Sequence, residues 1–249
     1  MAKQGEIEYL NAIGEGGRRH VEGRPFTDHN CGHYLARIGQ IMAFLPDPPA
    51  RILDMGCGSG WTSAFLAQRG FDVLGVDIAP DMIRVAEESR EAKGLERLWF
   101  LVGDYESLDY SEEFDAVVFF DSLHHAENEF EALRTAHRAL RTGGACVVSE
   151  PGVGHHKTAA SRHAIEEFDV NEKEMPPFKI ARMARAIGFR RVQTYAHQGQ
   201  LFDLANGTAS FQRTGPVGWL LRRRILQPVL VLLLMALLKR WSGVVVLTK

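Results

Sequence analysis

A run of alternating glycines follows an apolar segment at residues 51–55. Asp54 is followed by Gly56, Gly58 and Gly60, and Cys57 lies between the first two glycines. Glycine tolerates positive φ and has no Cβ, so a ligand can lie directly against the backbone amides of such a turn. The apolar residues before the turn predict a buried strand, and the residues after it predict a helix. The segment therefore has the composition of a ligand-binding turn between a strand and a helix.

Acidic residues follow three further predicted strands. These strands cover residues 72–77, 98–102 and 114–120, and the acids at their ends are Asp77, Asp104 and Asp121. The carboxyl ends of parallel strands meet at one edge of a sheet, where ligands of such folds bind. We therefore expect the three carboxylates to lie near the glycine turn. Each could instead cap the turn or helix that follows it.

Histidines gather at the same predicted edge. His124 and His125 follow the fourth strand, and His155 and His156 follow the fifth, which ends near Glu150. An imidazole at a ligand site can act as a general base, although backbone groups at a helix start can also satisfy it. We take His125, His155 and His124 as the candidate catalytic residues and favour the first two.

The elements around these residues alternate between strand and helix for about a hundred residues from Arg51. This alternation predicts an α/β fold with a doubly wound, mostly parallel seven-stranded sheet, an antiparallel last strand and helices on both faces. Residues 1–49 are expected to form an N-terminal helical lid, and residues 157–174 a polar helix. The core covers 50–202 and 242–249, and residues 203–241 form a helical insertion that is apolar and basic.

Two classes of cofactor use a glycine turn after the first strand of such a sheet. A dinucleotide site needs the spacing G-x-G-x-x-G, and here Trp61 stands where the last glycine would be. The order Asp54-x-Gly-x-Gly-x-Gly resembles instead the first motif of the class I S-adenosylmethionine-dependent methyltransferases. The resemblance covers residues from about 50 to 152 and includes the strand ends described above.

This resemblance implies roles for individual residues. Asp54 would bind the ammonium group of S-adenosylmethionine, Asp77 would bind the ribose hydroxyls, and Asp104 would accept from the adenine amine. The remaining residues would surround the amino-acid end, the adenine ring or the transferable methyl group: Gly56, Cys57, Gly58, Gly60, Ile78, Met82, Tyr105, Phe120 and Asp121.

The expected activity is methyl transfer to a small-molecule acceptor, with O-methylation favoured and a sugar, a lipid-linked intermediate or another natural product as substrate. Direct displacement from a sulfonium needs alignment of the reactants and, for a hydroxyl acceptor, a base. Two alternatives remain open. One is an NAD-dependent oxidoreductase, disfavoured by Trp61 and by the lack of a Tyr-x-x-x-Lys pair. The other is a non-catalytic cofactor-binding scaffold.

Composition narrows the partners and the compartment. The formal charge of −2, from 29 basic and 31 acidic residues, argues against nucleic acid. The three cysteines are far apart and lack metal-ligand spacing, so we expect no metal and a reducing compartment. The N-terminus has no apolar signal, which favours a cytoplasmic protein.

The segment 219–241 is apolar in its centre and basic at both ends. Its uninterrupted apolar part, about eleven residues from Val229, is too short to span a bilayer. An all-round apolar helix is either buried, here in a cap or a homodimer, or embedded in a membrane surface. The second alternative would make the protein peripheral at the membrane and suit a lipid-linked acceptor.

Overall fold

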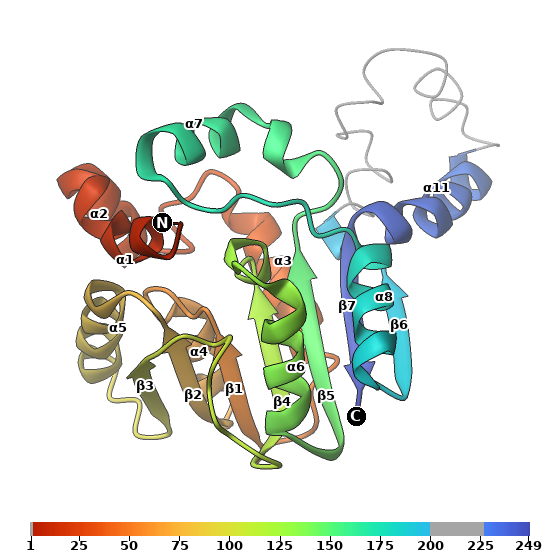
Figure 1. The fold of residues 1–249 in the computed structure, drawn as a ribbon, viewed down its shortest axis with the longest axis horizontal. Helices are drawn as coiled ribbons and strands as arrows, with labels where there is room; N and C mark the ends of the chain where they lie inside the picture. Colours follow the sequence, from red (N-terminus) through yellow and green to blue (C-terminus); the bar gives the residue numbers. More distant parts are fainter. Residues whose placement is uncertain (1, 200–226) are drawn as a thin grey trace.

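The computed structural model of the protein describes residues 2–199 and 227–249. Seven strands form one sheet in the order β3-β2-β1-β4-β5-β7-β6 (Figure 1). All neighbours pair in parallel except β7, which is antiparallel to both β5 and β6. The predicted fold class is therefore confirmed. The strands are β1 Arg51–Met55, β2 Asp72–Asp77, β3 Leu98–Val102, β4 Phe114–Phe120, β5 Leu140–Glu150, β6 Arg191–Tyr195 and β7 Gly243–Thr248.

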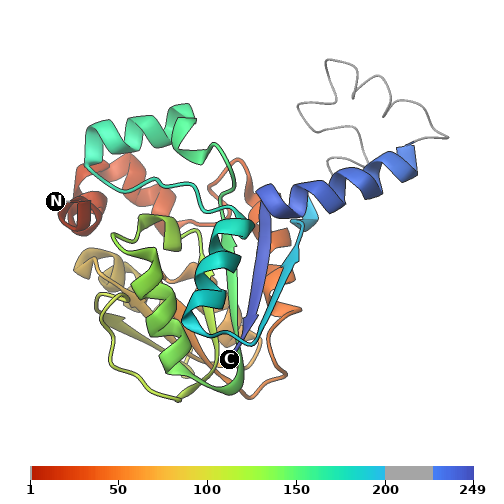
Figure 2. The ribbon, with the colours of Figure 1, turned by 45° about the vertical axis from the view of Figure 1, so that its right-hand side comes forward.

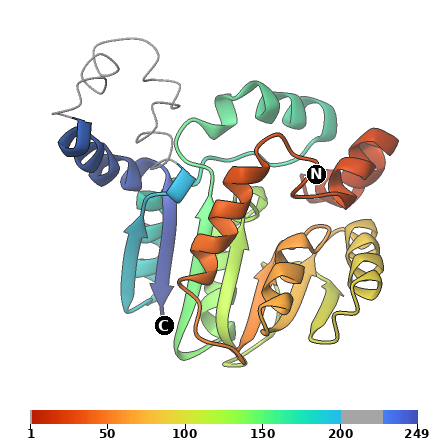
Figure 3. The same ribbon diagram turned by 180° about the vertical axis from the view of Figure 1, so that it is seen from behind.

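Helices connect the strands and cover both faces of the sheet. From the front of Figure 1, α6 and α8 cover one face, and the view from behind in Figure 3 shows α3 and α4 on the other. The helices are α1 Ala2–Ala12, α2 Gly14–Glu22, α3 Cys31–Met42, α4 Trp61–Gln68, α5 Pro80–Ala92, α6 Glu129–Ala139, α7 Ala159–Phe168, α8 Pro177–Ile187 and α11 Gln227–Trp241, with short 3₁₀ turns η1 Leu123–His125 and η2 His155–Lys157.

The central strand β4 shows why both faces must be covered. Val117 and Phe119 pack into the cluster beneath α6 and α8, whereas Val118 and Phe120 pack into the cluster beneath α3 and α4. Successive side chains of a strand point to opposite faces, so a strand that is apolar throughout needs a layer of helices on each side.

The glycine turn follows β1 at the point where the strand order reverses. β1 pairs with β2 on one side and with β4 on the other, and the chain reaches β4 only after β2 and β3. Ligands of open α/β sheets bind in the crevice outside such a switch point. The topology therefore places the turn at the expected binding position.

The segment predicted as a lid divides into two parts. Helices α1 and α2 lie beyond the carboxyl edge of the sheet, together with α7 (Figure 1). Helix α3 packs instead on the sheet, where Ile38 and Ile41 join the core beneath α4. Of the segment predicted as a lid, α1 and α2 therefore lie over the carboxyl edge, whereas α3 belongs to the layer packed on the sheet.

Two helices on the C-terminal side, α7 and α11, fall within segments predicted to be helical, 157–174 and 203–241. The polar helix expected over 157–174 ends earlier, because Asp169 adopts a left-handed conformation with φ of 52°. Helix α11 projects away from the sheet before the chain returns as β7 (Figure 2). Most of the predicted insertion, residues 203–226, lies outside the described residues. Within residues 2–199 and 227–249, no helix has the length and apolar character needed to cross a membrane.

Candidate active site

A cavity of about 850 Å³ lies at the carboxyl edge of the sheet, beneath α1, α2 and α7. Drug-sized ligands occupy pockets of roughly 300–1,000 Å³, so this cavity can hold a cofactor and part of a second ligand. Most of the residues predicted to bind the cofactor line it, as do the three candidate catalytic histidines: Gly56, Cys57, Gly58, Asp77, Ile78, Met82, Asp104, Tyr105, Phe120, Asp121, His124, His125 and His155.

The glycines of the turn serve different purposes. Gly58 has a φ of +52°, and a Cβ built on it would meet only open space, so it faces the cavity. Its amide donates to Asp77 Oδ2 at 2.8 Å, which ties the turn to the end of β2. A Cβ on Gly60 would lie 2.5 Å from Phe100 Cζ. Gly60 is therefore required for packing and does not line the cavity.

Asp54 lies behind the turn and does not line the cavity. Its Oδ2 accepts from Thr62 Oγ1 at 2.7 Å and from Ser63 Oγ at 2.6 Å, so the carboxylate secures the first turn of α4. Burial raises its pKa, although these two hydrogen bonds oppose the shift. Asp54 Oδ1 is buried and has no hydrogen-bond partner among the described residues. The predicted contact of Asp54 with an ammonium group stays a prediction.

Asp77 and Asp104 both line the cavity. Asp77 accepts from the amides of Gly58 and Ala79, and burial raises its pKa despite these two bonds. Asp104 accepts from the amide of Glu106 at 2.9 Å, as a turn-capping residue would. It also receives Lys3 Nζ of α1 at 2.7 Å. Asp104 thus caps its turn and still presents its carboxylate to the cavity.

Asp121 is clamped by an arginine that the sequence analysis missed. Arg37 of α3 donates through two nitrogens to both carboxylate oxygens, each at 2.6 Å, and also to Ser149. Burial raises the pKa of Asp121, but the charge and hydrogen bonds of Arg37, together with the nearby imidazoles, hold the pKa below its usual range. The guanidinium lies 4.4 Å from the ring centre of Phe120. Asp121 therefore does not cap the helix that follows it.

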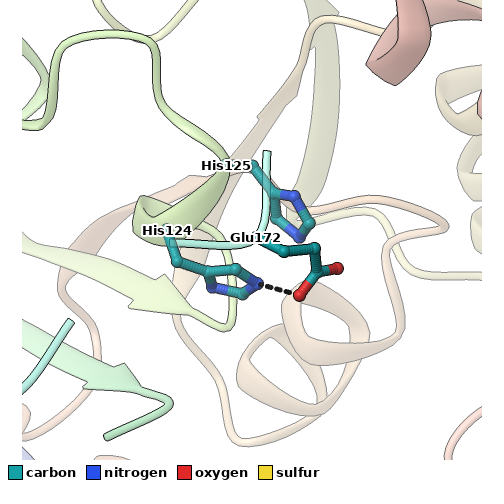
Figure 4. Close-up of side chains that lie close together, drawn as sticks. All are labelled: His124, His125 and Glu172. Atoms are coloured by element: carbon teal, nitrogen blue, oxygen red, sulfur yellow. Dashed lines mark ion pairs between the residues drawn. The ribbon is translucent and has the colours of Figure 1, made fainter. Parts of the chain in front are cut away.

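Imidazoles and carboxylates also pair with one another along the cavity wall. Buried Glu150 accepts from the amides of Ser122 and Leu123, and its Oε2 lies 2.7 Å from His124 Nδ1. A carboxylate at this distance accepts a hydrogen bond from Nδ1–H, so Nε2 is the unprotonated nitrogen of the neutral ring. His124 Nε2 points toward Glu172 Oε2, 3.9 Å away (Figure 4).

The two favoured histidines belong to the same cluster. His125 Nδ1 lies 3.0 Å from Glu6 Oε1 of α1. Burial disfavours the imidazolium, but the hydrogen bond and charge of Glu6 outweigh it and raise the pKa of His125 to about 9. His155 Nε2 lies 2.6 Å from Glu172 Oε2. His156 points elsewhere and pairs with Glu174.

Glu6 and Glu172 had no signal in the sequence, because each reaches the cluster from a remote segment. Glu6 lies on α1, and Glu172 lies in the extended segment that begins where α7 ends. Neither lies near a strand end, which was the basis for selecting candidates. Glu150 was noted at the correct edge, but not as the partner that orients His124.

These residues fit S-adenosylmethionine. The cavity offers an open glycine turn, carboxylates at the end of β2 and beyond β3, and the half-buried apolar side chains of Ile78 and Met82. The carboxylates suit ribose and amine groups, and the turn lacks the spacing of a pyrophosphate site. An imidazole–carboxylate cluster in the same cavity supplies groups that can hold a second ligand.

Comparison with known proteins matches residues 52–144 to a methyltransferase domain. A ubiquinone biosynthesis O-methyltransferase of Xanthomonas oryzae pv. oryzae is 32% identical over 118 residues, which cover 45% of this chain and 48% of the relative. A demethylmenaquinone methyltransferase of Thermus thermophilus is 37% identical over 109 residues, which cover 43% of this chain and 49% of the relative. The chain thus spans about half the length of the curated relatives it matches.

A solved structure extends the likeness to nearly the whole chain. Phosphoethanolamine N-methyltransferase 2 of Haemonchus contortus, in complex with S-adenosyl-L-methionine, superposes with a TM-score of 0.67 at 19% identity. The match covers 98% of this chain and 59% of that one. At this identity the comparison shows a shared fold.

Proposed function

We propose that the chain, whose residues 52–144 match a methyltransferase domain, is a class I S-adenosylmethionine-dependent methyltransferase that transfers a methyl group to a hydroxyl of a small-molecule acceptor. The observation that carries the proposal is the shared cavity. Residues suited to the cofactor line it, and so does the cluster of His124, His125, His155 and Glu172.

The residues suited to the cofactor define how it would be held. Asp77 would accept from the ribose hydroxyls, and Asp104 would accept from the adenine amine. Gly58 would let the amino-acid end approach the backbone, because no side chain fills the space beside it. Ile78 and Met82, which line the same wall, would pack against the adenine ring.

The imidazole–carboxylate cluster would receive the acceptor. When bound, S-adenosylmethionine supplies an electrophilic methyl group on a positively charged sulfur. The acceptor oxygen must face that methyl and lose its proton as the carbon–oxygen bond forms and the carbon–sulfur pair returns to sulfur. His124 Nε2 faces the cavity because Glu150 holds Nδ1, so its orientation suits contact with the acceptor oxygen. An unprotonated imidazole nitrogen at the cavity supports a hydroxyl acceptor.

Two of the matched relatives are named a ubiquinone biosynthesis O-methyltransferase and a demethylmenaquinone methyltransferase, which supports a small-molecule acceptor here, whereas a third is named a 23S rRNA methyltransferase. A sugar or a lipid-linked intermediate remains part of the proposal. Helix α11 exposes Leu232 and Leu233 and ends in Lys239 and Arg240, features that favour contact with a membrane surface over burial in a homodimer.

Calorimetry and a transfer assay test this function. Titration with S-adenosylhomocysteine should show one site per chain, whereas NADH should not bind; the reverse result would favour an oxidoreductase. Labelled S-adenosylmethionine incubated with a small-molecule extract should then yield a labelled product whose label is released under conditions that cleave methyl ethers or esters. Cofactor binding without any labelled product would instead indicate a non-catalytic scaffold.

A further inference from the structure

We propose that His124, His125 and Glu172 bind one divalent transition-metal ion in the cavity. The spacing of the cysteines predicts no metal site, whereas Glu172 is distant from the two histidines in the sequence and meets them only in the fold. The binding site is inferred from geometry alone, and the role of the ion rests on the proposed methyl transfer.

The three side chains converge on one point. Each offers a ligand atom, and these atoms all lie within 4.8 Å of one another (Figure 4). Metal–ligand distances of about 2.0–2.2 Å in a tetrahedral site place ligand atoms roughly 3.4 Å apart. His124 Nε2 and Glu172 Oε2 are 3.9 Å apart, so small side-chain rotations complete the site.

The outer contacts of the histidines are those of metal ligands. Glu150 lies 2.7 Å from His124 Nδ1, and Glu6 lies 3.0 Å from His125 Nδ1. A metal-bound histidine almost always donates its other ring N–H to such an acceptor, which fixes the ring and raises its basicity. Both rings are held in this way, and each has its Nε2 left for an ion.

The charge of the region also favours a cation. Glu6, Glu150 and Glu172 bring three carboxylates to a small, largely buried space, and each of them pairs there with an imidazole. Buried carboxylates need positive charge close by, and a dication supplies two units of it. Two imidazoles and one carboxylate suit Zn²⁺ or a similar transition-metal ion, whereas Mg²⁺ and Ca²⁺ prefer oxygen ligands.

Three protein ligands leave a position open for the acceptor. A bound ion polarises an oxygen that enters this position and lowers the pKa of its proton. The hydroxyl proton then passes to water, the oxygen lone pair forms the bond to the methyl carbon, and the carbon–sulfur electron pair returns to sulfur. In this arrangement His124 is a ligand and the ion activates the hydroxyl.

Co²⁺ titration tests the site without any acceptor. The full chain is freed of metal with a chelator and titrated with Co²⁺, and visible absorption reports its imidazole ligands. We expect one Co²⁺ per chain and at least a tenfold weaker affinity in Glu172→Gln and in His125→Asn. Glu150→Gln, which changes the outer contact of His124 but none of the three proposed ligands, should weaken binding about 10–100-fold.

His156→Ala is the matched control, because this neighbouring histidine pairs with Glu174 outside the cluster. It should bind Co²⁺ like the wild type. Calorimetry with S-adenosylhomocysteine verifies folding of every variant and tests the cofactor site separately. Wild-type affinity no higher than that of Glu172→Gln, with cofactor binding intact, would overturn the metal site and leave the methyltransferase proposal standing. A wild-type protein that binds Co²⁺ as expected but does not bind S-adenosylhomocysteine would support the metal site and oppose the methyltransferase proposal.

Discussion

The clamp between Arg37 and Asp121 allows a quantitative test of how α3 supports the site. Arg37→Met keeps the length and apolar contacts of the side chain but removes its charge. Asp121 then loses both hydrogen bonds at 2.6 Å, and Ser149 loses a donor. We expect the variant to be less stable because a carboxylate remains unpaired at the cavity wall.

The exposed fractions of the two side chains set the magnitude. Breaking a fully buried ion pair by removing one partner costs about 3–5 kcal/mol. The side chains of Arg37 and Asp121 are 16% and 27% exposed, so solvent screening reduces this loss of stability. We expect a loss of about 2–4 kcal/mol, which lowers the melting temperature by about 4–16 °C in a chain of this size.

Thermal unfolding by circular dichroism, with Arg97→Met as the control, measures this loss. Arg97 also makes two hydrogen bonds to one carboxylate, that of Asp72, but on the surface, where such a pair contributes at most about 1 kcal/mol. Arg37→Met with Asp121→Asn should recover part of the stability, since asparagine tolerates the positive φ at position 121.

The effect should also depend on pH. With Arg37 present, the pKa of Asp121 is depressed, so the pair stabilises the fold above the unfolded pKa of about 3.9 and loses this effect as pH falls through the folded value. Without Arg37, burial raises that pKa, and protonation relieves the unpaired charge at mildly acidic pH. The difference between variant and wild type should therefore narrow as pH falls. Equal melting temperatures at neutral pH would refute the reasoning.

Three further changes address the cofactor site, the turn and α11. Asp77→Asn should weaken the binding of S-adenosylhomocysteine about 10–100-fold, measured by calorimetry, because hydrogen bonds to a charged acceptor contribute about 1.5–3 kcal/mol. An unchanged affinity would exclude Asp77 as a residue that binds the cofactor. Gly60→Ala should lower stability in urea by about 2–4 kcal/mol, from the clash with Phe100 and the positive φ, and no loss would contradict that packing. Leu232→Glu with Leu237→Glu should abolish flotation with anionic liposomes; flotation equal to wild type, or none by the wild type, would oppose membrane contact.

The fold was predictable because its signals are local. Apolar runs such as 114–120 predict buried strands without knowledge of their neighbours, and the glycine turn marks the junction of strand and helix. Parallel strands then bring their carboxyl ends together whatever the details of packing. Asp77, Asp104 and His124 were located at the cavity for this reason.

The contacts within the site were not predictable, because they join distant segments. Arg37 is 84 residues from Asp121, and Glu6 is 119 residues from His125. No periodicity distinguishes these residues from others on their helices. The expected helix over 157–174 would have left Glu172 on a solvated face, whereas the left-handed turn at Asp169 ends α7 and lets the chain cross the cavity.

Helix α1 contacts the cavity wall at two places, with Lys3 on Asp104 and Glu6 on His125. These residues are one helical turn apart on a rigid element, so the two contacts cannot separate independently. Any displacement of α1 would break both contacts together. The carboxylate proposed for the adenine amine and the imidazole proposed near the acceptor are therefore held by the same helix.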